Sequence, residues 1–280
     1  MRDFLRSLPH TLGVVDLREI VQRIAAAVRA RRPVVLGMGA HPLKVGLSPL
    51  IIDLLERGIL SAVAMNGAGI IHDFELAYQG ETSEDVAAAL RDGSFGMARE
   101  TGEFLNAAIH AGVSQAGVGI GRAVGEQIRT AGLPYVHLSI LATCARLDVP
   151  ACVHVAVGTD IIHMHPQVDG AAIGEGSLRD FRLLTAVVAQ LEGGVFINLG
   201  SAVIVPEVFL KALALARNLG HTVKTFTTVD LDFVRHYRPA MNIVTRPTQQ
   251  GGRGFHLTGH HEILFPLLCA AVIEELATLP

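Results

Sequence analysis

Histidines dominate the residues of this sequence that could do chemistry near neutral pH. There are 13 of them among 280 residues, and the densest pattern is Asp160-Ile-Ile-His-Met-His165. In an extended segment, side chains two residues apart share a face, so His163 and His165 could bind one divalent metal ion such as zinc, with Asp160 as an oxygen ligand. Loop histidines more often make ordinary hydrogen bonds. The segment therefore predicts either a metal site or a pair of hydrogen-bonding side chains.

Four side chains near predicted strand ends suit acid–base catalysis or substrate binding: Lys44, His72, Asp73 and His163. Lys44 is one of only three lysines, and a desolvated lysine can act as a base or form an imine. The alternative is an ordinary lysine that binds an anion. For Asp73 the alternative is a cap at a helix N-terminus. We expect these four residues to serve catalysis.

Two glycine-rich turns follow predicted strands, namely Gly37-Met-Gly39 and Asn66-Gly-Ala-Gly69. Because glycine has no Cβ, the backbone N–H groups of such turns can approach a phosphate or a ribose. Neither turn has the GxGxxG pattern of dinucleotide-binding folds. Turns with a purely structural role are the alternative. The cofactor interpretation depends on several turns converging at one edge of a sheet.

The elements that must position these residues alternate between short apolar runs and helical patterns. This order predicts an α/β fold, a Rossmann-like parallel sheet with helices on both faces. In an open parallel sheet, ligands bind at the carboxyl ends of the strands, so the candidate residues should share that edge. The predicted strands span residues 33–37, 61–65, 151–157, 195–199, 225–229 and 242–245, the predicted helices span 47–57, 138–147, 180–191, 206–218 and 263–276, and a polar helical region spans 81–106.

The amino-acid composition excludes several classes of protein. Half of the residues are hydrophobic, 18% are charged and the mean hydropathy is +0.42, which excludes a disordered chain. A net charge of −3 gives no basic surface for nucleic acid or for a membrane. The three cysteines form no CxxC pair, so we expect no disulfide framework and a cytoplasmic location. With no signal peptide, linker or repeat apparent, we expect a single domain over residues 1–280.

A family resemblance is carried by four segments. The longest covers residues 36–74 and reads LGMGAHPLKVGLSPLIIDLLERGILSAVAMNGAGIIHDF. It resembles, without a gap, the Gly-loop helix, the strand and the TTAGGxEED segment of deoxyhypusine synthase. Three later segments resemble later blocks of that enzyme in the same order, and they read SILATCARLDVPACVHVAVGTD, FINLGSAV and GHHEILFPLL. The resemblance extends over residues 30–275.

This resemblance implies the NAD-binding fold of the deoxyhypusine synthase-like family and a homotetramer as the assembly. It also places the cofactor site residue by residue, although four of the positions differ in residue type from the family. The residues implied to bind NAD are Ala40, His41, Asn66, Gly67, Ala68, Gly69, Thr159, Asp160, Gly200, Ser201 and His260.

Deoxyhypusine synthesis itself is not expected. The family's enzyme attaches the butylamine of spermidine to a lysine near its C-terminus, beside a tryptophan, whereas this sequence has no tryptophan and no lysine after Lys224. We expect instead an NAD-dependent enzyme, of the transferase or lyase type, that acts on a small amine or amino-acid-like substrate through transient hydride transfer. Two alternatives stay open: a metal-dependent hydrolase or lyase that uses Asp160, His163 and His165, and a catalytically silent nucleotide-binding protein.

Overall fold

Six strands form one sheet in the computed structural model, which describes residues 2–277. The strand order is β3-β2-β1-β4-β5-β6, and every neighbouring pair runs parallel. The predicted Rossmann-like parallel sheet is therefore confirmed. The strands are β1 (Val34–Met38), β2 (Ala62–Asn66), β3 (Ala151–His154), β4 (Val195–Leu199), β5 (Thr227–Asp232) and β6 (Arg253–Thr258).

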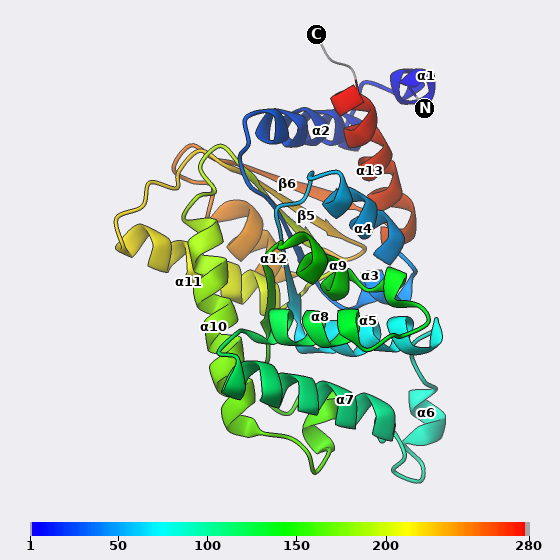
Figure 1. Ribbon diagram of the computed structural model, residues 1–280. Coiled ribbons are helices and arrows are strands. Elements are labelled where there is room, and N and C mark those ends of the chain that lie inside the picture. Colours follow the sequence, from blue (N-terminus) through cyan, green and yellow to red (C-terminus); the bar gives the residue numbers. More distant parts are fainter. Residues whose placement is uncertain (1, 278–280) are drawn as a thin grey trace.

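Helices cover both faces of this sheet (Figure 1). Helices α2, α4, α9 and α13 pack on one face, and α10 and α11 pack on the other. Within residues 2–277, no helix has the length and apolar character needed to cross a membrane. The α-helices are α1 (Arg2–Ser7), α2 (Gly13–Arg29), α3 (His41–Lys44), α4 (Ser48–Glu56), α5 (Gly67–Gln79), α6 (Val86–Ala89), α7 (Arg99–His110), α8 (Ile120–Thr130), α9 (Ile140–Leu147), α10 (Gly170–Val188), α11 (Ile204–Asn218), α12 (Tyr237–Pro239) and α13 (His261–Ala277).

The strand order reverses between β1 and β4. From β1 the chain builds outward through β2 to β3, then returns to β4 and continues through β5 to β6 on the other side. In folds of this kind, ligands bind outside the carboxyl ends of the two strands that flank the reversal. The turns that follow β1 and β4 therefore lie where a ligand site is expected.

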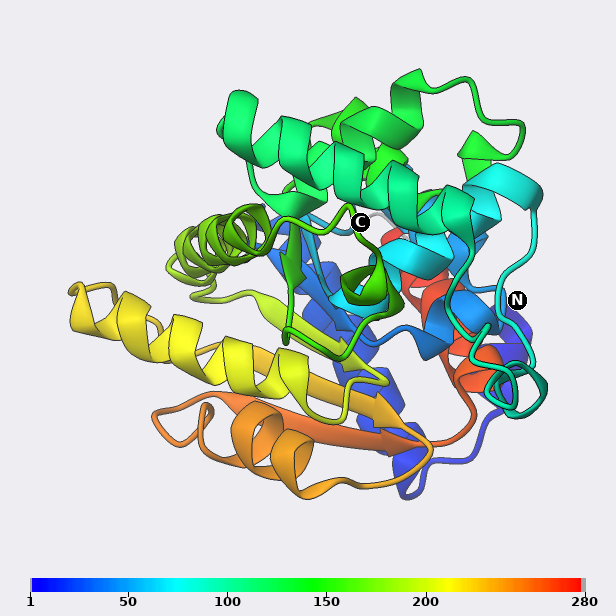
Figure 2. The same ribbon diagram turned by 90° about the horizontal axis from the view of Figure 1, so that it is seen from below.

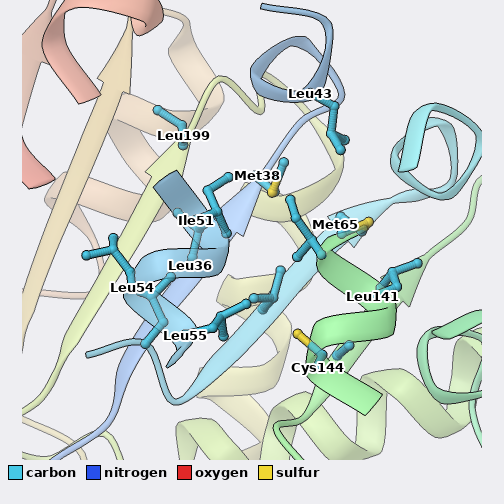
Figure 3. Close-up of a cluster of buried hydrophobic side chains, with 14 of the residues drawn as sticks. Leu36, Met38, Leu43, Ile51, Leu54, Leu55, Met65, Leu141, Cys144 and Leu199 are labelled. Atoms are coloured by element: carbon cyan, nitrogen blue, oxygen red, sulfur yellow. The ribbon is translucent and has the colours of Figure 1, made fainter. Parts of the chain in front are cut away.

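The strands bury side chains on both faces, which explains why they read as continuous apolar runs. In β1, Leu36 and Met38 belong to a larger core cluster, whereas Val35 belongs to a smaller cluster on the side of α10 and α11. Figure 3 shows part of the larger cluster, in which Ile51 from α4 and Leu141 from α9 surround the β1 side chains. Two packed faces hold the sheet, and its carboxyl edge, in a fixed place.

The prediction of the last strand was wrong. Residues 242–245 belong to a π-helix, η4 (Ala240–Thr245), and the sixth strand is β6, in a segment outside the predicted strands and helices. Because β6 lies at the edge of the sheet, only Phe255 and Leu257 of its side chains are buried, so its apolar signal is weak.

The polar region 81–106 is also not a continuous helix. It contains α6 and the first part of α7, joined by turns. Gly93 and Gly96 adopt positive φ angles of 80° and 75°, a left-handed conformation that interrupts a right-handed helix. This segment, residues 80–98, forms an irregular excursion beside α5.

Candidate functional site

The turns after β1 and β4 touch each other. The N–H of Gly39 donates to the carbonyl of Leu199 over 3.0 Å, and a Cβ on Gly39 would lie 2.3 Å from the carbonyl oxygen of Gly200. The structure thereby brings Ala40 and His41 next to Gly200 and Ser201, four of the residues predicted to bind the cofactor. Ser201 is buried, and its hydroxyl accepts the N–H of Val205 at the start of α11.

The glycines of the strand-end turns are explained by contacts within the protein. A Cβ on Gly67 would lie 2.0 Å from Oδ2 of Asp160. Gly200 has a φ of 65°, and a Cβ there would lie 2.5 Å from the ring of His261. Side chains of this chain therefore lie against both positions, and the glycines allow the strand-end loops to pack closely. Their predicted role in binding a dinucleotide stays a prediction.

Asp160 and His163 form a capped turn at the end of β3. The Asp160 carboxylate accepts the backbone N–H of His163, and Nδ1 of His163 accepts the N–H groups of Gly158 and Asp160 over 3.1 and 3.3 Å. Since Nδ1 accepts two hydrogen bonds, the neutral ring carries its proton on Nε2. His163 is therefore held as a hydrogen-bond donor and not as the base that its sequence position suggested.

Two buried polar atoms face each other across this turn. Nε2 of His163 and Oδ2 of Asp160 are 4.0 Å apart, and neither has a hydrogen-bond partner among the residues described. Oδ1 of Asn66, at the end of β2, is a third buried atom of this kind. Because buried polar atoms are normally paired, these atoms mark a place for a polar ligand or for water. Figure 2 shows the loop after β3 crossing beside the start of α5.

The predicted metal site does not form. Ile161–Met164 is a 3-10 helix and not an extended segment, so His163 and His165 do not share a face. Nε2 of His165 lies 2.9 Å from the carbonyl oxygen of Gly96, in a buried contact that holds the excursion. Over residues 2–277, no group of three or more histidine, cysteine or acidic side chains could hold a metal ion.

A cavity of about 350 Å³ opens beside the start of α5, between that helix, α3, the excursion and the loop after β3. Five residues predicted from the sequence line it: Lys44, Ala68, His72, Thr159 and Asp160. Two of them were predicted to be catalytic and three to bind the cofactor. The fold therefore brings the two predicted groups into one cavity.

His72 is oriented by two neighbours that sequence analysis missed. Its Nδ1 lies 2.6 Å from Oγ1 of Thr82, and this hydroxyl donates its own proton to the Glu75 carboxylate. Thr82 can then only accept from His72, so the neutral ring carries its proton on Nδ1 and has a free lone pair on Nε2. Burial alone would raise the pKa of Glu75, but the hydrogen bonds from His72 and Thr82 outweigh it and lower that pKa. His72 can act as a base.

Asp73 lies on the other side of α5 and serves the fold. Its buried carboxylate accepts the hydroxyl of Ser139 and the N–H groups of Ile140 and Leu141, over 2.5, 2.7 and 3.2 Å. Burial raises its pKa to about 6, even though these hydrogen bonds lower it. Asp73 does not line the cavity that His72 lines, because its carboxylate is buried against the start of α9. The catalytic role predicted for Asp73 is replaced by a cap on α9.

The adjacent histidines at the start of α13 have different surroundings. His260 is exposed, and its Nδ1 lies 3.5 Å from Oε1 of Glu262. His261 is only 3% exposed, and its Nδ1 lies 2.9 Å from Nδ1 of His41. The family resemblance predicted His260 as the residue that binds NAD. From the sequence alone, the two adjacent histidines cannot be told apart, because their different burial is visible only in the structure.

Comparison with known proteins gives likeness of structure alone. No protein-family model and no curated protein matches this chain. An LOR/SDH protein of Methanococcus maripaludis superposes with a TM-score of 0.61 at 14% identity, over 95% of this chain and 69% of that one. A protein of Entamoeba histolytica assigned as a deoxyhypusine synthase superposes with a TM-score of 0.58 at 12% identity, over 95% and 90%.

Two larger proteins contain the same fold as one part. The cyanobacterial arginine dihydrolase ArgZ superposes with a TM-score of 0.57 at 14% identity, and AgrE, solved with ornithine and NAD⁺, with 0.54 at 13%. This chain spans 34% of the first and 33% of the second. Together with the parallel sheet in the order β3-β2-β1-β4-β5-β6, these superpositions show that the chain has the deoxyhypusine synthase-like fold.

Proposed function

We propose that this protein is an NAD-binding enzyme that acts on a small amine or amino-acid-like substrate. The observation that carries this proposal is the cavity beside α5, where a base-competent histidine, a lysine and several carboxylates meet the loops at the carboxyl edge of the sheet. The likeness to AgrE, which was solved with ornithine and NAD⁺, supports the same choice of cofactor and substrate class.

The unpartnered atoms at the ends of β2 and β3 suit the hydroxyl groups of a nucleotide. Oδ1 of Asn66 and Oδ2 of Asp160 are acceptors, and Nε2 of His163 is a donor. A ribose offers hydroxyl groups that both donate and accept, so it suits the facing atoms of Asp160 and His163. These residues would hold the cofactor, which would accept a hydride from the substrate carbon when bound.

The charges round the cavity suit a cationic group. Glu75, Glu84, Glu100 and Asp160 line it, against a single lysine, Lys44. The lowered pKa of Glu75 keeps its carboxylate ionised at neutral pH. An ammonium group would be attracted to these carboxylates, and Lys44 would attract the carboxylate of an amino acid.

In this mechanism His72 removes the proton that the ammonium group must lose. Its lone pair on Nε2 is kept available by Thr82, and the ionised Glu75 stabilises the imidazolium that forms. Lys44 orients the substrate. No step in this scheme requires the lysine that deoxyhypusine synthesis would need. A homotetramer is part of the proposal because the resemblance implies one.

Calorimetric titration with NAD⁺, followed by a single-turnover assay of NADH formed on the enzyme with a panel of diamines and basic amino acids, tests the proposal. We expect one NAD⁺ per chain and a substrate-dependent signal that His72→Gln reduces by at least about tenfold, since general bases contribute roughly 10²–10⁴-fold to rates. His110→Gln, at an exposed histidine of α7 bonded to Asp169, is the matched control. A folded wild type without NAD⁺ affinity would overturn the cofactor assignment, and binding without turnover would favour a silent nucleotide-binding protein.

A further inference from the structure

A second histidine pair lies at the point where the strand order reverses. His41 follows β1, His261 begins α13, and Gly200, which follows β4, lies against the His261 ring. Nδ1 of His41 and Nδ1 of His261 are 2.9 Å apart, with the ring centroids 5.0 Å apart. The distance between the nitrogens is that of a hydrogen bond, so one ring must donate and the other must accept.

The surroundings of His261 decide which ring donates. Its Nε2 is buried and unpartnered, and it lies 3.7 Å from Oδ1 of Asp232 at the end of β5. A backbone hydrogen-bond interaction with Leu231 also favours the protonated ring. The Asp232 carboxylate near Nε2 favours a proton on that nitrogen, which leaves Nδ1 of the neutral ring as an acceptor. His41 must then donate from its own Nδ1.

This arrangement leaves His41 with a lone pair on Nε2. His41 is exposed, and Lys44, three residues further along the same short helix, lines the substrate cavity. Residues three apart lie on the same side of a helix. We propose that Asp232, His261 and His41 form a proton relay, and that Nε2 of His41 is a second acid–base group of the enzyme. The inference rests on the function proposed above.

The relay performs a proton transfer. An N–H or O–H bond of the substrate or of water breaks, its electron pair stays on the nitrogen or oxygen, and the proton forms a bond with Nε2 of His41. The imidazolium is stabilised because its Nδ1 proton can move towards Nδ1 of His261, and the Asp232 carboxylate, 3.7 Å from Nε2 of His261, stabilises the positive charge on that ring. His261 and Asp232 are positioning residues, since neither is exposed to substrate.

Burial and the nearby charges fit this division of roles. Burial lowers the pKa of His261, Asp232 and Glu262 raise it, and His41 lowers it. The net decrease keeps the His261 ring neutral at pH 7, as an acceptor requires. The remaining charged residues on α3, β5 and α13 are Lys44, which is exposed, Asp230, whose carboxylate contacts Asn198 and His256, and Glu274 and Glu275 at the far end of α13.

The test is the tautomer of His41, measured by long-range ¹H–¹⁵N correlation on the whole protein without cofactor. We expect the Nδ1–H form to dominate in the wild type, whereas a free imidazole favours Nε2–H. In His261→Phe the acceptor is lost, and His41 should revert to Nε2–H. His260→Phe, at the exposed neighbouring position, should leave the His41 signals unchanged. A wild-type His41 in the Nε2–H form would overturn the relay.

A second variant covers the case in which His261→Phe does not fold. In Asp232→Asn the carboxylate that favours a proton on Nε2 of His261 is removed, so the share of the Nδ1–H form of His41, read from the same spectra, should decrease. An unchanged His41 tautomer would overturn the role of Asp232. In the NADH assay, the acid limb of the pH–rate profile should move to lower pH in Asp232→Asn, with the KM for NAD⁺ unchanged. Wild-type calorimetry with NAD⁺ tests the proposed function separately, because the tautomer is measured without cofactor.

Discussion

Adding a single methyl group at Gly67, as in Gly67→Ala, should weaken cofactor binding strongly while changing the stability of the fold only slightly. Gly67 is the first residue of α5, and a Cβ there would lie 2.0 Å from Oδ2 of Asp160. Cβ atoms essentially never lie closer than 3.0 Å to another heavy atom, so in Gly67→Ala the Asp160 carboxylate must move away from the new Cβ by at least about 1 Å. A short side chain such as aspartate cannot move so far and still accept the N–H of His163 in the capped turn.

Gly67→Ala has two opposite effects on the free energy of unfolding, and they nearly cancel. Loss of the cap costs about 1 kcal/mol, and replacing a helical glycine by alanine returns about 0.5–1 kcal/mol. Gly170→Ala is a matched control, because Gly170 is also the first residue of a helix and has nothing within 4 Å of its Cβ position. We expect Gly170→Ala to be about 1 kcal/mol more stable than Gly67→Ala, the contribution of the lost cap.

The effect on cofactor binding should be much larger. A hydrogen bond to a charged group contributes about 1.5–3 kcal/mol, so displacing Asp160 should weaken NAD⁺ binding about 10- to 100-fold. Urea denaturation measures the stabilities, and calorimetric titration measures the affinities of the two variants and the wild type. Equal stability changes in the two variants, together with an unchanged NAD⁺ affinity in Gly67→Ala, would refute the packing of Asp160 against α5 as a requirement of the site.

Four further outcomes are expected. Burial raises the pKa of Asp180 to about 7, so folding favours its neutral form. The stability that this carboxyl group contributes is fully present below about pH 4 and is lost as the pH rises through 7. Between pH 5 and 8, urea denaturation should therefore show the wild type losing about 3 kcal/mol more stability than Asp180→Asn. Asp73→Ala leaves three buried donors at the start of α9 unpaired and should cost about 3 kcal/mol by the same method. Incubation with spermidine, NAD⁺ and an acceptor protein should give no aminobutyl transfer by mass spectrometry, because no lysine follows Lys224; a modified acceptor would contradict this. Replacing His163 and His165 by alanine should not change the zinc content in elemental analysis, since the two rings do not converge on one ion; zinc lost with the pair would restore the metal site.

The sheet could be predicted because its strands are buried on both faces. The strand predicted at residues 195–199 coincides with β4, and those at 33–37 and 61–65 lie within one residue of β1 and β2. The sixth strand was missed because an edge strand buries only alternate side chains and because glycines surround it. Continuous apolar runs identify central strands, whereas the edge of a sheet has no such signal.

The candidate site was predicted in part, because residue type and position do not determine a tautomer. The sequence identified His72, His163 and Asp73 as similar candidates, but their roles depend on which atoms their neighbours offer. Backbone N–H groups make His163 a donor, a threonine hydroxyl makes His72 an acceptor, and the start of α9 engages Asp73. Thr82, ten residues after His72, reaches it only because the excursion folds back over α5. Contacts of this kind arise from the path of a loop.

The cap that Asp73 makes on α9 also fixes the dimensions of the cavity. A shift of α5 along its axis would break three hydrogen bonds of a buried carboxylate at once. These bonds therefore fix the position of α5, and of the side chains that it presents to the cavity. The opposite wall, at residues 83–98, is largely exposed and contains left-handed glycines, and it can change in length without disturbing the sheet. Substrates of different length would then be distinguished by this excursion. We expect proteins that share this fold to differ in substrate size where the segment between α5 and α7 differs in length.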